Sequence, residues 1–300
     1  MIMKTINKHF QSAGNISLVQ LDTLKGEGLY FVPAASAIDR GELEIREVRQ
    51  EGSVNTLLAI NFSDQYCLLT DMDLLKGAKQ NRVVNTSALL APNSKREIRV
   101  SCVERSRWSY DSPDFKSAPS VMDSNMRAAK AASLSEDLEG MVSETQSRIW
   151  DLINQEMTAH NVLCSTEDYN SVLESKAKVP HSEFNFKHEK GCNGLAIFDG
   201  RKLVSFDIFG NRDVYGYYFE KLTRDALGHA RSVTDDGALA QAEAFYRLDE
   251  FLDDFESKLG DPVERSLGEI GEFRWSADKN LTGFQLNFEN QLVHKAGFAG

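Results

Sequence analysis

The first 110 residues show the alternation of hydrophobic and polar positions that is typical of strands. In GELEIREV, residues 41–48, Leu43, Ile45 and Glu47 share one face and polar residues occupy the other, which predicts a half-buried strand. Further elements are expected here as strands at 16–21, 53–63 and 65–72 and as a short helix at 32–41 that Pro33 opens and Gly41 closes.

The middle and the C-terminal part of the chain mix helical and strand patterns. Asp199-Gly200 joins two hydrophobic runs within residues 194–209, and this dipeptide is a strong sign of a β-hairpin. The clearest helix, at 238–259, carries five large hydrophobic residues on one face: Phe245, Leu248, Leu252, Phe255 and Leu259. The other expected elements are helices at 135–158, 165–175 (capped by Ser165 or Thr166) and 211–232, and strands at 271–276, 282–289 and 291–298.

This order of elements indicates an α+β fold. We expect an antiparallel β-rich core with several helices, because the strands and helices do not alternate regularly as they do in a doubly wound sheet. A single domain is predicted over residues 1–300. Residues 109–135 are polar and poor in large hydrophobic side chains, so this segment is predicted to be mobile or loosely helical.

Composition and charge narrow the class of protein. The 300 residues are 41% hydrophobic, which is enough for a sizeable core, and no hydrophobic run reaches the length of about 18 residues that a membrane span needs. The net charge of −11 argues against non-specific nucleic-acid binding. The N-terminus has no hydrophobic signal segment and the four cysteines form no C-x-x-C motif, so we expect a cytoplasmic protein with reduced thiols.

Residues 82–90 and 96–104 flank the turn sequence A-P-N-S-K and predict a β-hairpin. With the turn centred between Asn93 and Ser94, paired residue numbers sum to about 187 or 188. Arg82 would then lie near residues 105–106, and Arg82 and Glu104 would form an ion pair. The polar and charged side chains at the ends of these two strands would then lie together at the open end of this hairpin.

The other residues that could bind a metal or act in catalysis have simpler explanations. His181 and His188 share a loop with Glu183 and Glu189 and could ligate a metal, but exposed loop histidines are much commoner than metal ligands. We predict no metal site. The acidic residues of the 238–259 helix could hold a cation, but a solvated helix face is expected. Cys102 could act as a nucleophile with His294 as its base, but a position inside a strand favours an inert thiol.

Two stretches of the hairpin region carry a resemblance to a known family. K-G-A-K-Q-N-R-V-V-N-T-S (76–87) and V-S-C-V-E-R-S-R-W (100–108) resemble the signature of the ARG- and rhodanese-phosphatase-superfamily-associated protein domain, found in bacteria and archaea. ARG there stands for ADP-ribosylglycohydrolase. Weaker similarity at 41–61, 145–153 and 291–298 extends the resemblance over residues 16–298, and two departures are Ala78, where the family has a second glycine, and Lys295 after His294. The resemblance implies a prokaryotic, cytoplasmic protein associated with ADP-ribose or nucleotide metabolism, and it carries over no catalytic residue, reaction or cofactor.

Two hypotheses of function remain open at this point. In the first, the protein is a non-catalytic scaffold or a partner in a homo-oligomer, and the Arg82–Glu104 pair is structural. In the second, it is an enzyme or sensor that binds a nucleotide or ADP-ribose-like ligand at the open end of the 82–104 hairpin. The candidate ligand-binding residues are Gln80, Asn81, Arg82, Glu104, Arg107 and Trp108.

Overall fold

Strands from interleaved parts of the chain build two separate units in the computed structural model. Unit 1 consists of Met1–Tyr30, Pro180–Glu264 and Gly271–Gly300, and unit 2 consists of Phe31–Val179 and Arg265–Ile270. The single domain expected over residues 1–300 stays a prediction, and each unit is described by itself. The structure describes residues 7–26, 28–136, 142–178, 185–229, 239–265, 267 and 269–300.

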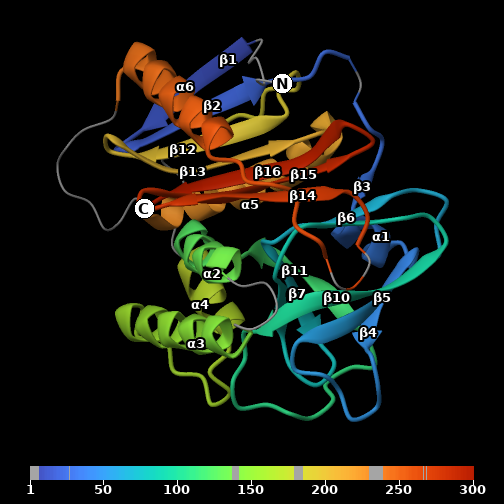
Figure 1. Cartoon of the computed structure of the whole chain (residues 1–300). Coiled ribbons are helices and arrows are strands. Elements are labelled where there is room, and N and C mark those ends of the chain that lie inside the picture. Colours follow the sequence, from blue (N-terminus) through green and yellow to red (C-terminus); the bar gives the residue numbers. More distant parts are fainter. Residues whose placement is uncertain are drawn as a thin grey trace. The chain divides into compact units, whose positions relative to one another are not determined.

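In the described part of unit 1, seven antiparallel strands form one sheet in the order β1-β2-β12-β13-β16-β15-β14 (Figure 1). The predicted hairpin is confirmed, because Asp199 pairs with Lys202 and Gly200 adopts a left-handed φ of 55°. The strands are β1 (Asn7–Ala13), β2 (Ile16–Asp22), β12 (Gly194–Asp199), β13 (Lys202–Phe209), β14 (Glu272–Asp278), β15 (Leu281–Phe288) and β16 (Gln291–Ala299).

Helices α5 (Arg212–His229) and α6 (Gln241–Ser257) cover opposite faces of this sheet (Figure 1). Phe206 of β13 contacts Phe255 of α6, with ring centroids 5.2 Å apart, whereas Phe209 of the same strand stacks on Tyr218 of α5 at 5.3 Å. Residues three apart on a strand point to opposite faces, so one strand serves both helices.

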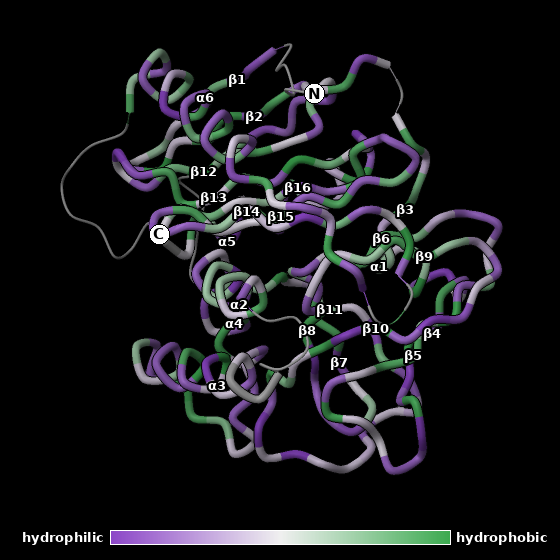
Figure 2. Tube along the Cα trace, viewed as in Figure 1, coloured by the Kyte–Doolittle hydropathy of each residue, from purple (hydrophilic) through white to green (hydrophobic). Residues whose placement is uncertain are grey.

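Helix α6 packs as its sequence pattern predicts. Leu248, Leu252 and Phe255 are buried in the core that α6 forms with the sheet, whereas Asp249 and Asp253 are exposed. Hydrophobic and hydrophilic positions alternate along its turns (Figure 2). The predicted solvated acidic face is therefore confirmed.

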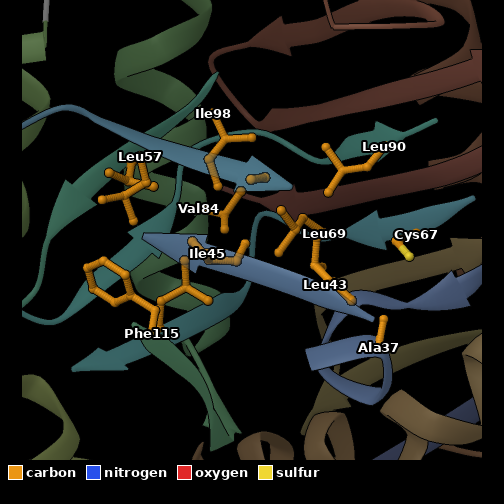
Figure 3. Packing of buried hydrophobic residues seen from close by; sticks show 14 of the residues in the cluster. Ala37, Leu43, Ile45, Leu57, Cys67, Leu69, Val84, Leu90, Ile98 and Phe115 are labelled. Carbon is orange, nitrogen blue, oxygen red and sulfur yellow. The ribbon is translucent and has the colours of Figure 1, made fainter. Parts of the chain in front are cut away.

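In the described part of unit 2, six strands form a sheet in the order β11-β7-β8-β10-β5-β4, and β3, β6 and β9 form a smaller one. The edge strands β4 and β11 also contact each other, so the larger sheet curls around a core that includes Ile45, Leu57, Val84 and Phe115 (Figure 3). The strands are β3 (Val32–Pro33), β4 (Leu43–Glu47), β5 (Thr56–Asn61), β6 (Cys67–Leu69), β7 (Asp73–Gly77), β8 (Arg82–Val84), β9 (Ala88–Leu90), β10 (Ser94–Cys102) and β11 (Phe115–Val121).

The helices of unit 2 are α1 (Ala34–Asp39), α2 (Ser124–Glu136), α3 (Val142–Ala159) and α4 (Tyr169–Ala177). Gly41 follows α1 with a φ of 71°, as its expected role at the helix end requires. Helix α4 is capped by Asp168, whose side chain accepts from Asn170 N, and not by Ser165 or Thr166 as expected. The segment 109–135 contains β11 and most of α2, and its mobility stays a prediction.

The predicted 82–104 hairpin has a different register and different partners. Arg82 pairs with Cys102 and Val84 with Val100, so paired numbers sum to 184. β9 pairs with β6, and the first half of β10 pairs with β5. The residues after β8 have a part in this. Asn85 accepts from Ser101 Oγ of β10, which holds the end of β8 in its register, whereas Ser87 Oγ accepts from Asp71 N, close to β6, the strand with which β9 pairs.

The α+β fold class is confirmed by these antiparallel-rich sheets and their helices. Of the helices that the described residues form, none has the length and hydrophobicity needed to cross a lipid bilayer.

Candidate functional site

The six candidate residues lie at one end of the six-stranded sheet of unit 2. Gln80 and Asn81 form the turn between β7 and β8, Arg82 begins β8, and Glu104 follows the end of β10. Asn81 N donates to Glu104 Oε2 at 3.1 Å, and the guanidinium of Arg82 lies 5.6 Å from the ring centroid of Trp108. Tertiary structure therefore brings the two sequence motifs together despite the altered register.

Asn81, Glu104 and Arg107 form a group that we call the Glu104 clasp. Arg107 Nε lies 2.9 Å from each carboxylate oxygen of Glu104, and Arg107 Nη2 lies 2.7 Å from Oε2. Arg107 also donates to the carbonyl oxygen of Ala78 at 2.7 Å, and Asn81 Oδ1 accepts from Gly77 N at 2.9 Å. These groups bind one another and the backbone, so the clasp holds the β7–β8 turn against the segment after β10.

The clasp replaces the predicted Arg82–Glu104 ion pair, which is wrong. Among the described residues Glu104 pairs with Arg107 and Arg82 forms no ion pair. The chain turns after β10, which brings Arg107 back to the residue three positions earlier. Burial raises the pKa of Glu104, but the hydrogen bonds from Arg107 and Asn81 outweigh it and hold that pKa below its ordinary value of 4.5.

Arg82 is fully buried (0% exposed) and is only partly satisfied. Its Nη1 donates to Gln80 O at 3.0 Å and to Gln80 Oε1 at 2.9 Å, and its Nη2 lies 3.5 Å from Ser53 O. Its Nε has no hydrogen-bond partner in the structure. Burial is the main cause that lowers the pKa of Arg82. A buried guanidinium with a free N–H is able to bind a further acceptor.

Glu47, at the end of β4, is a buried carboxylate beside the candidate residues that the sequence motifs did not include. It is 7% exposed, its Oε2 lies 3.4 Å from Ser53 N, and its Oε1 has no hydrogen-bond partner. The signal was present in the sequence, because a glutamate follows Leu43 and Ile45 at the next inward position of an alternating strand. A carboxylate on an apolar face needs a partner.

Cys102 has the properties of an inert thiol. It is buried opposite Arg82, and its Sγ lies 3.7 Å from the carbonyl oxygen of Val54. Burial raises the pKa of Cys102, and the nearby Arg82 opposes this only in part. His294, its proposed base, belongs to unit 1, where its Nε2 lies 3.1 Å from Asp207 Oδ1 and its ring stacks on Phe209. The geometry therefore does not support a cysteine nucleophile.

Trp108, Tyr110 and Lys79 form an exposed surface that we call the Trp108 platform. Trp108 is 47% and Tyr110 49% exposed, and Lys79 Nζ lies 5.5 Å from the ring of Trp108 and 5.2 Å from that of Tyr110. Lys79 Nζ also donates to Glu51 O at 2.8 Å. An exposed indole beside a cation is a suitable surface for stacking a planar, electron-rich ring.

The turn before the platform depends on unusual backbone conformations. Gly77 has a φ of 122°, and a Cβ there would lie 2.4 Å from Ser112 Oγ, so only glycine fits. Ala78 has a φ of 40°, in the left-handed region that disfavours side chains. A glycine would adopt this conformation without strain, and this chain keeps the turn with an alanine.

A second buried polar cluster in unit 2 connects α2 to the loop after β6. Arg127 of α2 forms two hydrogen bonds to the carboxylate of Asp71, at 2.9 and 3.0 Å, and Lys130 donates to Val84 O at 2.6 Å and to Asp71 O. Burial lowers the pKa of Lys130 to about 7, although Asp71 and Asp73 oppose this effect. These contacts attach the helix to the sheet.

Lys130 should make the stability of the protein depend on pH. In the folded state burial lowers the pKa of Lys130 to about 7, against an ordinary value of 10.5, so above pH 7 the unfolded chain binds the proton that the folded chain has lost. Stability should therefore rise with pH between about 7 and 10. Urea unfolding of the wild type and of Lys130→Met measures this, and the wild type should show the steeper rise. Parallel pH profiles would contradict the prediction.

No group of three or more metal-ligating side chains occurs among the residues that the structure describes. His188 packs against the rings of Tyr215 and Phe219, and burial lowers its pKa. His181 and Glu183, two of the four loop residues considered as metal ligands, lie outside the described residues.

A comparison with protein families matches residues 6–298 to the model of the ARG and Rhodanese-Phosphatase-superfamily-associated Protein domain. No curated protein and no solved structure matches the chain. The match covers nearly the whole chain and includes both units, the Glu104 clasp and the Trp108 platform.

Proposed function

Because the chain belongs to the ARG and Rhodanese-Phosphatase-superfamily-associated Protein domain family, we propose that it is a non-catalytic protein that binds a nucleotide-like or ADP-ribose-like ligand. The ADP-ribosylglycohydrolase in the family name supports a place beside enzymes of ADP-ribose or nucleotide metabolism. The proposal includes a cytoplasmic location, which the four free cysteines support.

The observation that carries the proposal is the Trp108 platform above the buried Arg82. The platform offers an exposed indole and a cation, and Arg82 offers a free N–H beneath them. Two residues considered as base or nucleophile, Glu104 and Cys102, are poorly suited to that role. Glu104 is held by Arg107, and the pKa of Cys102 is raised. This combination favours binding without chemical conversion.

Calorimetric titration with ADP-ribose, NAD and ATP tests the proposal. We expect saturable binding by the wild type and a loss of about five- to 150-fold in affinity in Trp108→Ala, because stacking of a base on an aromatic ring contributes about 1–3 kcal/mol. Tyr246→Ala is the matched control, since Tyr246 is an exposed aromatic residue on α6 of unit 1. Proton NMR of the same mixtures should show unchanged ligand, and product formation would overturn the non-catalytic assignment.

The second candidate function is a scaffold or a partner in a homo-oligomer. The polar contacts of the candidate residues favour it, because five of the six, all but Trp108, use polar groups inside the fold. If titration with ADP-ribose, NAD and ATP gives no heat of binding, the scaffold or oligomer function would be favoured over ligand binding. Light scattering would then measure the oligomeric state.

A further inference from the structure

Two buried polar atoms without partners lie at the end of the unit 2 core. Arg82 Nε carries a hydrogen to donate, and Glu47 Oε1 carries lone pairs that accept. The two residues stand on β8 and β4, at the ends of strands whose inner faces carry Val84 and Ile45. Buried polar atoms are almost always paired in native proteins, so two complementary unpaired atoms on residues that both contact Ser53 point to a further partner.

The structure places these two residues on either side of one short segment. Ser53 N lies 3.4 Å from Glu47 Oε2, and Ser53 O lies 3.5 Å from Arg82 Nη2. A Cβ on the preceding residue, Gly52, would lie 3.2 Å from Trp108 Cζ2 and 3.4 Å from Glu47 Oε2. Trp108 is therefore close to both residues, and its ring lies above the Arg82 guanidinium.

The charges at this place determine which ligand group fits. A phosphate or carboxylate would gain from Arg82 and from Lys79 of the Trp108 platform. Placed against Glu47 Oε1, however, it would be repelled by that carboxylate and would have no hydrogen to donate to it. A neutral group avoids this repulsion. It must offer an acceptor to Arg82 Nε and, beside it, a donor to Glu47 Oε1, and it must be planar to stack on Trp108.

We propose that Arg82 and Glu47 bind the acceptor–donor edge of a neutral planar group, with Trp108 against its face. The inference rests on the proposed ligand-binding function and names the part of the ligand that enters the site. A carboxamide has this edge, through its C=O and N–H, and so does adenine, through a ring nitrogen and its amino group. Arg82 is thereby assigned to a neutral edge and not to the phosphate suggested by its charge.

Benzamide and benzoate test the proposal because they share one shape and differ in charge. Ligand-observed NMR with the wild-type protein should show benzamide binding at least about tenfold more tightly than benzoate, the lower end for a charge-assisted contact. Glu47→Gln removes the repulsion and should reverse this preference, because benzoate can then pair with Arg82. Glu44→Gln on the same strand is the control and should keep the wild-type preference, since Glu44 pairs with Arg46.

Adenosine and ribose 5-phosphate show which chemical group supplies the acceptor–donor edge. Binding of adenosine assigns the site to a base, binding of benzamide without adenosine assigns it to a carboxamide, and ribose 5-phosphate should not bind. Equal binding of benzamide and benzoate by the wild type, or no binding of benzamide or adenosine, would overturn the proposal without the need for any variant. A folded Glu47→Gln protein that still prefers benzamide would also overturn it. Saturable binding of ADP-ribose or NAD in the calorimetric test would leave the proposed function intact in each of these cases.

Discussion

Replacing Asp71 with alanine should destabilise the protein by about 3–5 kcal/mol, because the change removes the buried carboxylate that accepts two hydrogen bonds from the Arg127 guanidinium. Both side chains are almost completely buried, and two hydrogen bonds of 2.9 and 3.0 Å join them. The change should also make the charged form of Lys130 less stable, since Asp71 favours that form. Urea unfolding followed by circular dichroism measures the change in the free energy of unfolding.

Three variants make this result specific. Asp64→Ala removes an exposed acid from a nearby loop and should change stability by less than about 0.5 kcal/mol. Arg127→Met alone should also destabilise the protein, by stranding Asp71. The double variant Asp71→Ala/Arg127→Met should be more stable than the sum of the two single effects predicts, because no buried charge of this pair remains. Strict additivity would show that the two charges are not coupled.

Replacing Glu104 with alanine should destabilise the protein by about 3 kcal/mol. The change removes the partner of Arg107 and the acceptor of Asn81 N. We expect the lower end of the range for buried pairs because the Arg107 side chain is 16% exposed and keeps its hydrogen bonds to Ala78 and Ser109. Thermal and urea unfolding provide the measurement.

The Glu104–Arg107 pair also predicts that the stability of the protein depends on pH in the acid range. The pKa of Glu104 is lowered in the folded state, so its contribution is present above the ordinary value of 4.5 and is lost as the pH falls through the lowered value. The destabilisation by Glu104→Ala should therefore shrink in acid. Glu97→Ala, an exposed change on β10, is the control and should have almost no effect. An equally small effect of Glu104→Ala at neutral pH would contradict the role of the clasp.

The candidate site was predictable in its location but not in its pairing. Gln80, Asn81, Arg82, Glu104, Arg107 and Trp108 do meet at one strand end, as the motifs indicated. The ion pair expected for Arg82 was wrong, because a shift of three to four residues in register exchanges the neighbours of every side chain. Register depends on contacts of Asn85 and Ser87 with other parts of unit 2, and no local pattern contains them.

The sequence by itself determined those features that depend on neighbouring residues. The period of α6 set its buried face, Asp199-Gly200 set the turn of the β12–β13 hairpin, and the hairpin-region motifs identified the family. Only the tertiary structure decided which distant strands pair and which charges meet. It placed β16 between β13 and β15, joined Arg107 to Glu104, and left Arg82 and Glu47 each with an unpaired atom. The physical reason is that helical period and turn chemistry act over a few residues, whereas strand pairing and charge burial depend on the packing of the whole unit.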